Sequence, residues 1–389
     1  LLAEATAVHP DIKQWQHQWK AAETTVPQAG AWSDPRIGLN LMNLPVTDPG
    51  FDLEPMTGKQ VQLSQQIPFP GITGLRKRLA EEKSLQVEQL YEDVRNTVQY
   101  RLKDAYYALS YCDNAIRITE KNKTLMQTFI RTAETKYATG KGIQQDVLKA
   151  QMEYSKLLER LIKLKRQRTQ LQAKINTLLN RDTESVIGDL APVSVIPFEY
   201  SVDELQSLAD EQRPLLRSKE LNVRLAELRH DLAQKQYYPN FMVSLGYTQR
   251  DNRRDFLTGM FSLSIPIFAG RKQDMEVEQT SLEIQAAREQ YNSVQNEIHF
   301  AVNDLHAGIQ ENNDLLQLYS EGILHQASQA LESAVAAYQV DKVDFLTLIS
   351  NQTTLLNYEI DYYRVLTDYR RMIARTEWVV GQRLTASLQ

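Results

Sequence analysis

Apolar residues recur along two long stretches of the chain at the spacing of helices that pack as coiled coils. One seam of alternating three- and four-residue steps runs through 154–178, interrupted by Arg168, and a second runs through 355–379. No proline occurs in residues 71–191 or 267–389. Since proline breaks the interior of a helix, both stretches are predicted to form long helices.

Each proline-free stretch contains one turn signal, which divides it into a helical hairpin with a long first arm. Two glycines permit a turn at 138–142, and the sequence Val-Asp-Lys-Val gives a weaker signal at 340–343. The predicted hairpins cover residues 72–180 and 271–385. Helices of this length suit a tube or a spacer.

The proline-rich segments between the hairpins alternate apolar and polar residues with a period of two, which indicates strands. The predicted strands cover about 36–43, 60–68, 240–250 and 259–268. Their length suits membrane strands, although soluble antiparallel sheets show the same alternation. Four strands are too few to close a barrel, so a membrane barrel requires several chains.

The sequence indicates a tandem duplication of one structural unit. Pro10 corresponds to Pro214 and Tyr137 to Tyr338, at offsets of 204 and 201 residues. The predicted fold is therefore mainly helical with a small sheet, duplicated in tandem. The first repeat covers 1–190 and the second 191–389, each in the order helix, strand, strand, helical hairpin.

Composition limits the remaining possibilities. With 24% charged residues, the chain contains no apolar run long enough for a transmembrane helix. The net charge of −5 gives no support to nucleic-acid binding. Cys112 is the only cysteine, which excludes an internal disulfide framework. No signal peptide is visible, and we expect any leader to lie outside this chain.

The chain shows no recognisable enzymatic motif. It contains no phosphate-binding glycine loop, zinc-protease motif or nucleophile elbow. His299 and His306 lie seven residues apart on one helix, about 10 Å of rise, which is too far to share one metal ion. We therefore expect no enzyme activity, no cofactor and no metal site.

Two motifs carry a resemblance to a known family. The segment from Tyr137 to Gln151 reads Tyr-Ala-Thr-Gly-Lys-Gly-Ile-Gln-Gln-Asp-Val-Leu-Lys-Ala-Gln, and 264–271 reads Ser-Ile-Pro-Ile-Phe-Ala-Gly-Arg. Both resemble the TolC-like outer-membrane efflux proteins. Asp34-Pro-Arg and the segment 64–71 further resemble the heavy-metal-efflux branch of that family.

The resemblance implies an assembly and partners. A homotrimer would form a 12-stranded β-barrel in the outer membrane of a Gram-negative bacterium and a 12-helix α-barrel that extends into the periplasm. A periplasmic adaptor protein and an inner-membrane pump would be its partners, and metal ions or drugs its cargo. An outer-membrane channel for type I protein secretion shares this fold, and a coiled-coil structural scaffold is the alternative of a different class.

Three sets of residues follow as candidates. One face of the strands is predicted to contact lipid: Phe241, Val243, Leu245, Tyr247, Phe261, Leu263 and Ile265. The turns are predicted to contact the adaptor: Gly140, Lys141, Gly142, Lys342 and Val343. The resemblance implies acidic rings beyond the second turn, where this chain has Thr347 and Ser350, so earlier acids are proposed to substitute. The candidate gate therefore comprises Asp341, Asp344, Thr347, Ser350, Tyr338 and Asp146, with a hydrogen bond expected between the last two.

Overall fold

The computed structural model describes residues 1–47, 49–52 and 54–384, which form two compact units. Of the described residues, unit 1 comprises 1–14, 92–214 and 295–384, and unit 2 comprises 15–91 and 215–294. Each unit therefore takes segments from both predicted repeats.

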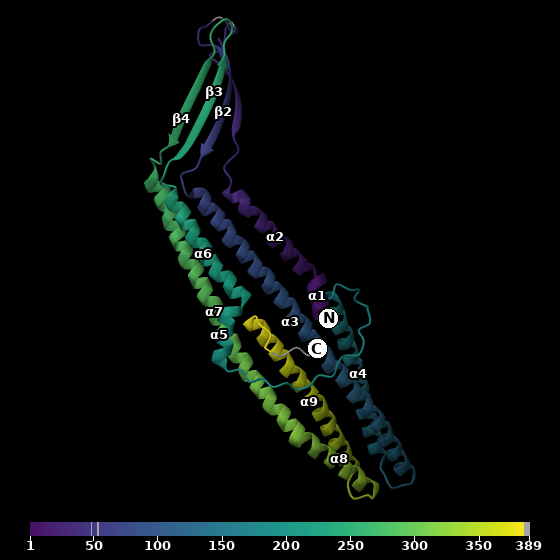
Figure 1. Ribbon diagram of the computed structural model, residues 1–389. Coiled ribbons are helices and arrows are strands. Elements are labelled where there is room, and N and C mark those ends of the chain that lie inside the picture. Colours follow the sequence, from purple (N-terminus) through teal and green to yellow (C-terminus); the bar gives the residue numbers. More distant parts are fainter. Residues whose placement is uncertain (48, 53, 385–389) are drawn as a thin grey trace. The chain divides into compact units, whose positions relative to one another are not determined.

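The order of the elements repeats itself, as the duplication predicts (Figure 1). The first series is α1 (Leu2–Val8), α2 (Pro10–Gly30), β1 (Arg36–Met42), β2 (Gly58–Ile67), α3 (Ile72–Ala138) and α4 (Gln144–Leu178). The second is α5 (Val202–Gln212), α6 (Pro214–Lys235), β3 (Asn240–Gln249), β4 (Phe256–Ser264), η1 (Ala269–Arg271), α7 (Gln273–Leu318), η2 (Tyr319–Ile323), α8 (Leu324–Gln339) and α9 (Phe345–Val380).

The two matched prolines occupy the same structural position. Pro10 begins α2 and Pro214 begins α6, each directly after a short helix. Proline suits the first position of a helix because its fixed φ is helical and its missing N–H would have no partner there. The correspondence found in the sequence thus marks equivalent helix starts.

Unit 2 contains an antiparallel sheet in the order β1-β2-β3-β4. In its register, Leu63 lies opposite both Ile37 and Leu245. Because side chains alternate across a strand, one apolar face results. We define the apolar face as Ile37, Leu39, Val61, Leu63, Val243, Leu245, Tyr247, Leu257, Phe261 and Leu263.

The two faces of the sheet differ in exposure and chemistry. On the apolar face, Leu39 is 80% exposed and Phe261 63%. On the other face, Ser244 and Thr248 are buried, and Asn40 donates hydrogen bonds to Gln60 and Gln62. The predicted alternation is therefore present, with large apolar side chains on one face and mostly small or polar ones on the other, where Met242, Met260 and Phe256 also lie.

The predicted bounds of the fourth strand were wrong at both ends. β4 starts at Phe256 and ends at Ser264, where Pro266 follows and cannot donate a ladder hydrogen bond. Ile265 therefore lies one residue beyond the strand to which it was assigned. Leu257, which was not predicted, belongs to the apolar face instead.

Both predicted helical turns are present, between α3 and α4 and between α8 and α9. The expectation of a single interruption in each stretch was wrong for the second, because the π-helical turn η2 separates α7 from α8. This π turn contains Gly322 but no proline and keeps the helix continuous, so hydrophobic spacing alone does not reveal it.

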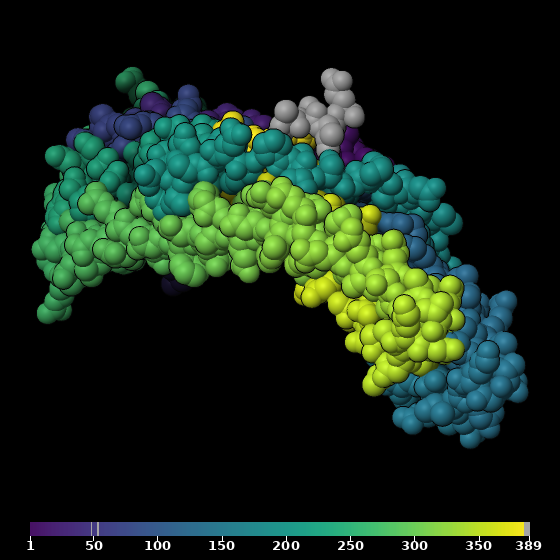
Figure 2. Space-filling model, turned by 90° about the horizontal axis from the view of Figure 1, so that it is seen from below, coloured from purple at the N-terminus to yellow at the C-terminus, as the bar shows by residue number. Residues whose placement is uncertain are grey.

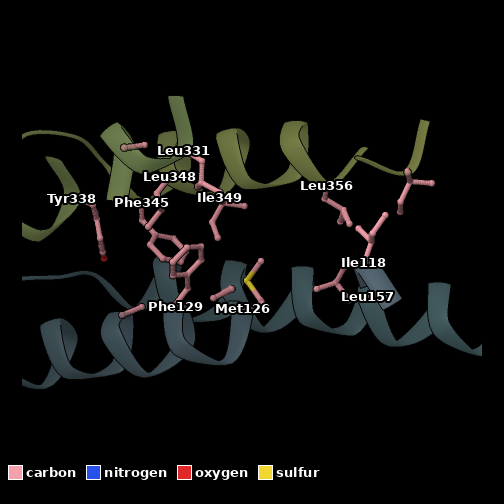
Figure 3. Packing of buried hydrophobic residues seen from close by; sticks show 14 of the residues in the cluster. Ile118, Met126, Phe129, Leu157, Leu331, Tyr338, Phe345, Leu348, Ile349 and Leu356 are labelled. Carbon is pink, nitrogen blue, oxygen red and sulfur yellow. The ribbon is translucent and has the colours of Figure 1, made fainter. Parts of the chain in front are cut away.

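The core of unit 1 lies between the two hairpins (Figure 3). Met126 and Phe129 of α3 face Phe345 and Ile349 of α9, all of them buried. The predicted seam of α4 contributes Leu157, which packs in the same cluster. These side chains hold the α3–α4 hairpin against the α8–α9 hairpin.

Helix α9 is buried on more sides than its predicted seam. Tyr369 and Val379 from that seam are buried, but so are Phe345, Gln352 and Ile373 from outside it. Gln352 donates a 2.7 Å hydrogen bond to the side-chain oxygen of Asn122 on α3. The heptad pattern thus identified one of the faces of a helix that packs on several neighbours.

The interruption of the first seam has a direct explanation. Arg168 on α4 donates a 2.6 Å hydrogen bond from Nε to Asp113 on α3. Both side chains are about one-third exposed. A partly solvated ion pair of this kind replaces an apolar contact at modest cost.

Candidate functional site

The ends of the two hairpins in unit 1 lie side by side (Figure 2). Both turns have the same backbone. At the end of α3, the N–H of Lys141 donates to the carbonyl of Lys136 at 2.9 Å, and at the end of α8 the N–H of Lys342 donates to Ala337 at 2.9 Å. This six-residue closure is the Schellman motif.

The motif requires a left-handed residue after the helix. Gly140 fills that position in the first turn with φ of +71°, and Asp341 fills it in the second with φ of +58°. Glycine adopts this conformation without steric cost, and aspartate tolerates it better than most residues. The second turn therefore has a physical basis even without a glycine.

Lys136 joins the two turns. Its ammonium group donates a 2.7 Å hydrogen bond to the main-chain carbonyl of Tyr338 and forms an ion pair with the Asp341 carboxylate. It also lies 4.1 Å from the centre of the Tyr338 ring. The lysine side chain is 15% exposed, so these contacts lie largely out of solvent.

The last turn of α8 suits a cation. The carbonyl groups at a helix C-terminus lack helical partners, and the helix dipole places partial negative charge there. Tyr338 is one residue from the end of α8, and its carbonyl points at Lys136. A carboxylate, a carbonyl and an aromatic face thus hold one ammonium group.

Tyr338 itself is part of the core. The ring is buried and lies 5.5 Å from that of Phe345, whereas Tyr137, its counterpart in the first repeat, is half exposed. Burial raises the pKa of the Tyr338 hydroxyl, and the carboxylates of Asp146 and Asp341 raise it further.

The expected hydrogen bond between Asp146 and Tyr338 is not formed within the chain. Among the described residues, the buried Tyr338 hydroxyl has no hydrogen-bond partner. Burial and the nearby Asp344 carboxylate raise the pKa of Asp146, which Lys136 partly opposes. Lys136, which sequence reasoning missed, makes the link between hairpins. The sequence shows only a lysine in the last turn of a helix.

Asp344 has a local role. It precedes α9 and accepts a 2.8 Å hydrogen bond from the N–H of Thr347, which is an N-cap. The hydrogen bond lowers the pKa of Asp344. The Lys136 ammonium likewise lowers the pKa of Asp341. Thr347 and Ser350 are exposed.

The predicted adaptor-contact residues lie at the surface of the turns. Gly140, Lys141 and Lys342 are exposed, and Gly142 and Val343 are half-buried. Val343 packs against the hairpin core. Three apolar side chains that sequence reasoning missed are also more than half exposed beside the turns: Ile143, Leu148 and Leu346.

The described residues show neither a membrane-spanning helix nor a metal site. No helix among them is both long and apolar enough to cross a bilayer. Nor do they contain a group of three or more His, Cys, Asp or Glu side chains arranged to hold a metal ion.

The sequence model of the family described as "Outer membrane efflux protein" matches residues 1–181 and 205–375. The chain belongs to this family. Membership confirms the TolC-like resemblance and the outer-membrane location. It also confirms that the chain is an efflux protein and no enzyme.

Solved structures of outer-membrane proteins share the fold. VceC from Vibrio cholerae superposes with a TM-score of 0.84 at 15% identity, over 99% of this chain and 96% of VceC. CusC gives 0.83 at 14% identity, over 98% and 91%. The Neisseria gonorrhoeae channel MtrE gives 0.81 at 13% identity, over 100% and 89%. A search of curated protein sequences finds no match.

Proposed function

We propose that three copies of this chain form a passive exit duct across the outer membrane. The duct would receive its cargo, metal ions or drugs, from a periplasmic adaptor and an inner-membrane pump. The apolar face of the sheet would contact lipid, and the hairpin ends of unit 1 would form the closed end of the tunnel.

The open sheet is the observation that carries this proposal. Among the described residues, β1 and β4 each pair with a neighbour on one side only, yet the sheet exposes ten mostly large apolar side chains on one face. In a bilayer, an unpaired strand edge costs several kcal/mol per unsatisfied group. Twelve strands from three chains would satisfy the edges by pairing β4 of one chain with β1 of the next.

The Lys136 contacts support a gate at the hairpin ends. They join two hairpins about 200 residues apart in the chain through one ammonium group. Moving the α8–α9 hairpin away from α3 breaks the hydrogen bond, the ion pair and the ring contact together. An adaptor that offered the turns better partners would shift the population towards this open state.

The adaptor would dock on the turns themselves. Exposed lysines lie beside exposed Ile143, Leu148 and Leu346, a mixture of charge and apolar surface suited to a specific protein contact. Equivalent turns from both repeats would give the trimer six such surfaces.

The mass of the protein in detergent tests the assembly. Native mass spectrometry is expected to give three times the 44.7 kDa of one chain. Planar bilayers containing this species should show discrete channel openings. A stable monomer in detergent, or a trimer that never conducts, contradicts the duct.

A further inference from the structure

A hollow of about 510 Å³ lies in unit 2, where β4 leaves the sheet and α7 begins beside the end of α6. Figure 1 shows the place where these elements meet. The walls of the hollow come from the start of β3, the end of β4, the end of α6 and the starts of α3 and α7. Neither the channel nor the gate uses it.

The hollow is positively charged. Arg76, Lys235 and Lys272 line it, and no acidic side chain does. Among the described residues none of the three forms an ion pair, although Lys235 lies 5.3 Å from the ring centre of Tyr238. Three cations around one space without a carboxylate favour an anionic ligand.

One side of the hollow is apolar and open. Ile265, Ile267 and Phe268 line it, and Ile267 is 75% exposed. These residues continue directly from the end of β4, whose Phe261 and Leu263 belong to the apolar face. A small inorganic anion would leave this apolar surface in water, whereas an amphiphile would cover it.

A buried acceptor completes the wall. Gln273 is 6% exposed, and its Oε1 has no hydrogen-bond partner among the described residues. An unsatisfied buried acceptor costs about 1–3 kcal/mol, so a donor from a ligand would be favoured there. A headgroup with a free hydroxyl supplies such a donor.

We propose that this hollow binds one anionic glycerophospholipid per chain. The phosphate would lie among Arg76, Lys235 and Lys272, a headgroup hydroxyl would donate to Gln273, and an acyl chain would run over Ile265 and the apolar face. The inference rests on the proposed contact of that face with lipid. The hollow then lies at the level of the headgroups, where aromatic residues such as Tyr238 gather.

The test is a lipid titration of the purified full-length protein, followed by native mass spectrometry. Phosphatidylglycerol is expected to bind once per chain and phosphatidylcholine much more weakly. Lys235→Gln with Lys272→Gln should weaken phosphatidylglycerol binding about thirty-fold, since each surface cation contributes roughly a factor of five. The control, Arg78→Gln with Lys219→Gln, removes the same charge from α3 and α6 outside the hollow and should leave binding unchanged.

Three outcomes overturn the inference. The first is equal affinity for phosphatidylglycerol and phosphatidylcholine. The second is a loss of phosphatidylglycerol binding in the control variant as large as in the double variant. The third is displacement of the lipid by inorganic phosphate, which would make this a simple phosphate site. If the double variant fails to assemble, the two single variants Arg76→Gln and Lys272→Gln are each tested in its place. If the protein forms a conducting trimer but shows no preference for phosphatidylglycerol, the lipid site is refuted and the proposed duct is not.

Discussion

The Lys136 ammonium nitrogen lies 2.7 Å from the carbonyl oxygen of Tyr338, although 202 residues separate them. One hydrogen bond thus connects the last turn of α3 to the last turn of α8. The same ammonium group neutralises Asp341, the left-handed residue of the second turn. Removing the Lys136 ammonium group therefore takes away a hydrogen bond at the C-terminus of α8 and leaves the Asp341 carboxylate without its ion-pair partner.

Lys136→Met should increase the open fraction of the channel. Methionine keeps the aliphatic stem and removes the charged donor, and a hydrogen bond from a charged group contributes about 1.5 kcal/mol. The expected shift is about tenfold in the closed-to-open equilibrium per chain. Single-channel recording in planar bilayers measures it.

Lys342→Met is the matched control, since Lys342 is an exposed turn lysine for which no ion pair is formed among the described residues. It should conduct like the wild-type protein. If Lys136→Met also conducts like wild type, the link between the hairpins does not hold the gate closed.

Acid should weaken the same link. The pKa of Asp341 is lowered by Lys136, so the ion pair is fully present above the ordinary aspartate pKa and is lost as pH falls through the lowered value. The pKa of Asp146 is raised by burial and by the Asp344 carboxylate, so Asp146 protonates before Asp341 as the pH falls. Its protonation removes the repulsion between Asp146 and Asp344. Conductance should therefore stay low on mild acidification and rise only at lower pH.

Asp341→Asn separates these two steps. Asparagine tolerates the left-handed conformation and carries no charge, so the variant should conduct more at neutral pH and lose the acid-induced rise. An unchanged acid response in Asp341→Asn would assign the titration to another group.

The turns were predictable because their determinants are local. Gly140 signals a left-handed residue directly, and the duplication transfers that conformation to Asp341. The partner of Lys136 was not predictable, since it depends on how two separate hairpins pack. The hydrogen bond expected for Tyr338 fails within the chain because its ring packs on Phe345 and leaves its hydroxyl without a partner.

The sheet shows the same division between local and distant causes. Alternation predicted which side chains share a face, since a strand has a period of two. The end of β4 was misplaced because Ile265 and Ile267 keep the alternation after pairing stops, and Pro266 between them was the available signal. The hollow beyond β4 needs side chains from α3, α6 and α7 together, which no single segment encodes.

Cys112 should be inert in the folded protein. It is fully buried, its thiol donates to the carbonyl of Leu164, and burial raises its pKa to about 11. Only about one thiol in a thousand would be ionised at pH 8, and the thiolate is the reactive form. Iodoacetamide should therefore modify Cys112 only after unfolding, as followed by intact mass.

An exposed cysteine provides the reference for that experiment. In Ser350→Cys, the new thiol should react under native conditions while Cys112 stays unmodified, because Ser350 is exposed. Modification of Cys112 in the native protein at the rate of the exposed thiol would show that α3 and α4 separate readily.

The two faces of the sheet should respond oppositely to a charge. Phe261→Arg places a cation on the apolar face near the middle of β4 and should destabilise the inserted trimer by about 2–4 kcal/mol, because the bilayer centre does not solvate it. Ser262→Arg changes the next residue, on the opposite face, at nearly the same depth. Because Ser262 is exposed and lies on the face opposite the proposed lipid contact, this variant should assemble almost normally. Yields of folded trimer after refolding into lipid measure the difference, and equal yields would refute the assignment of the apolar face to lipid.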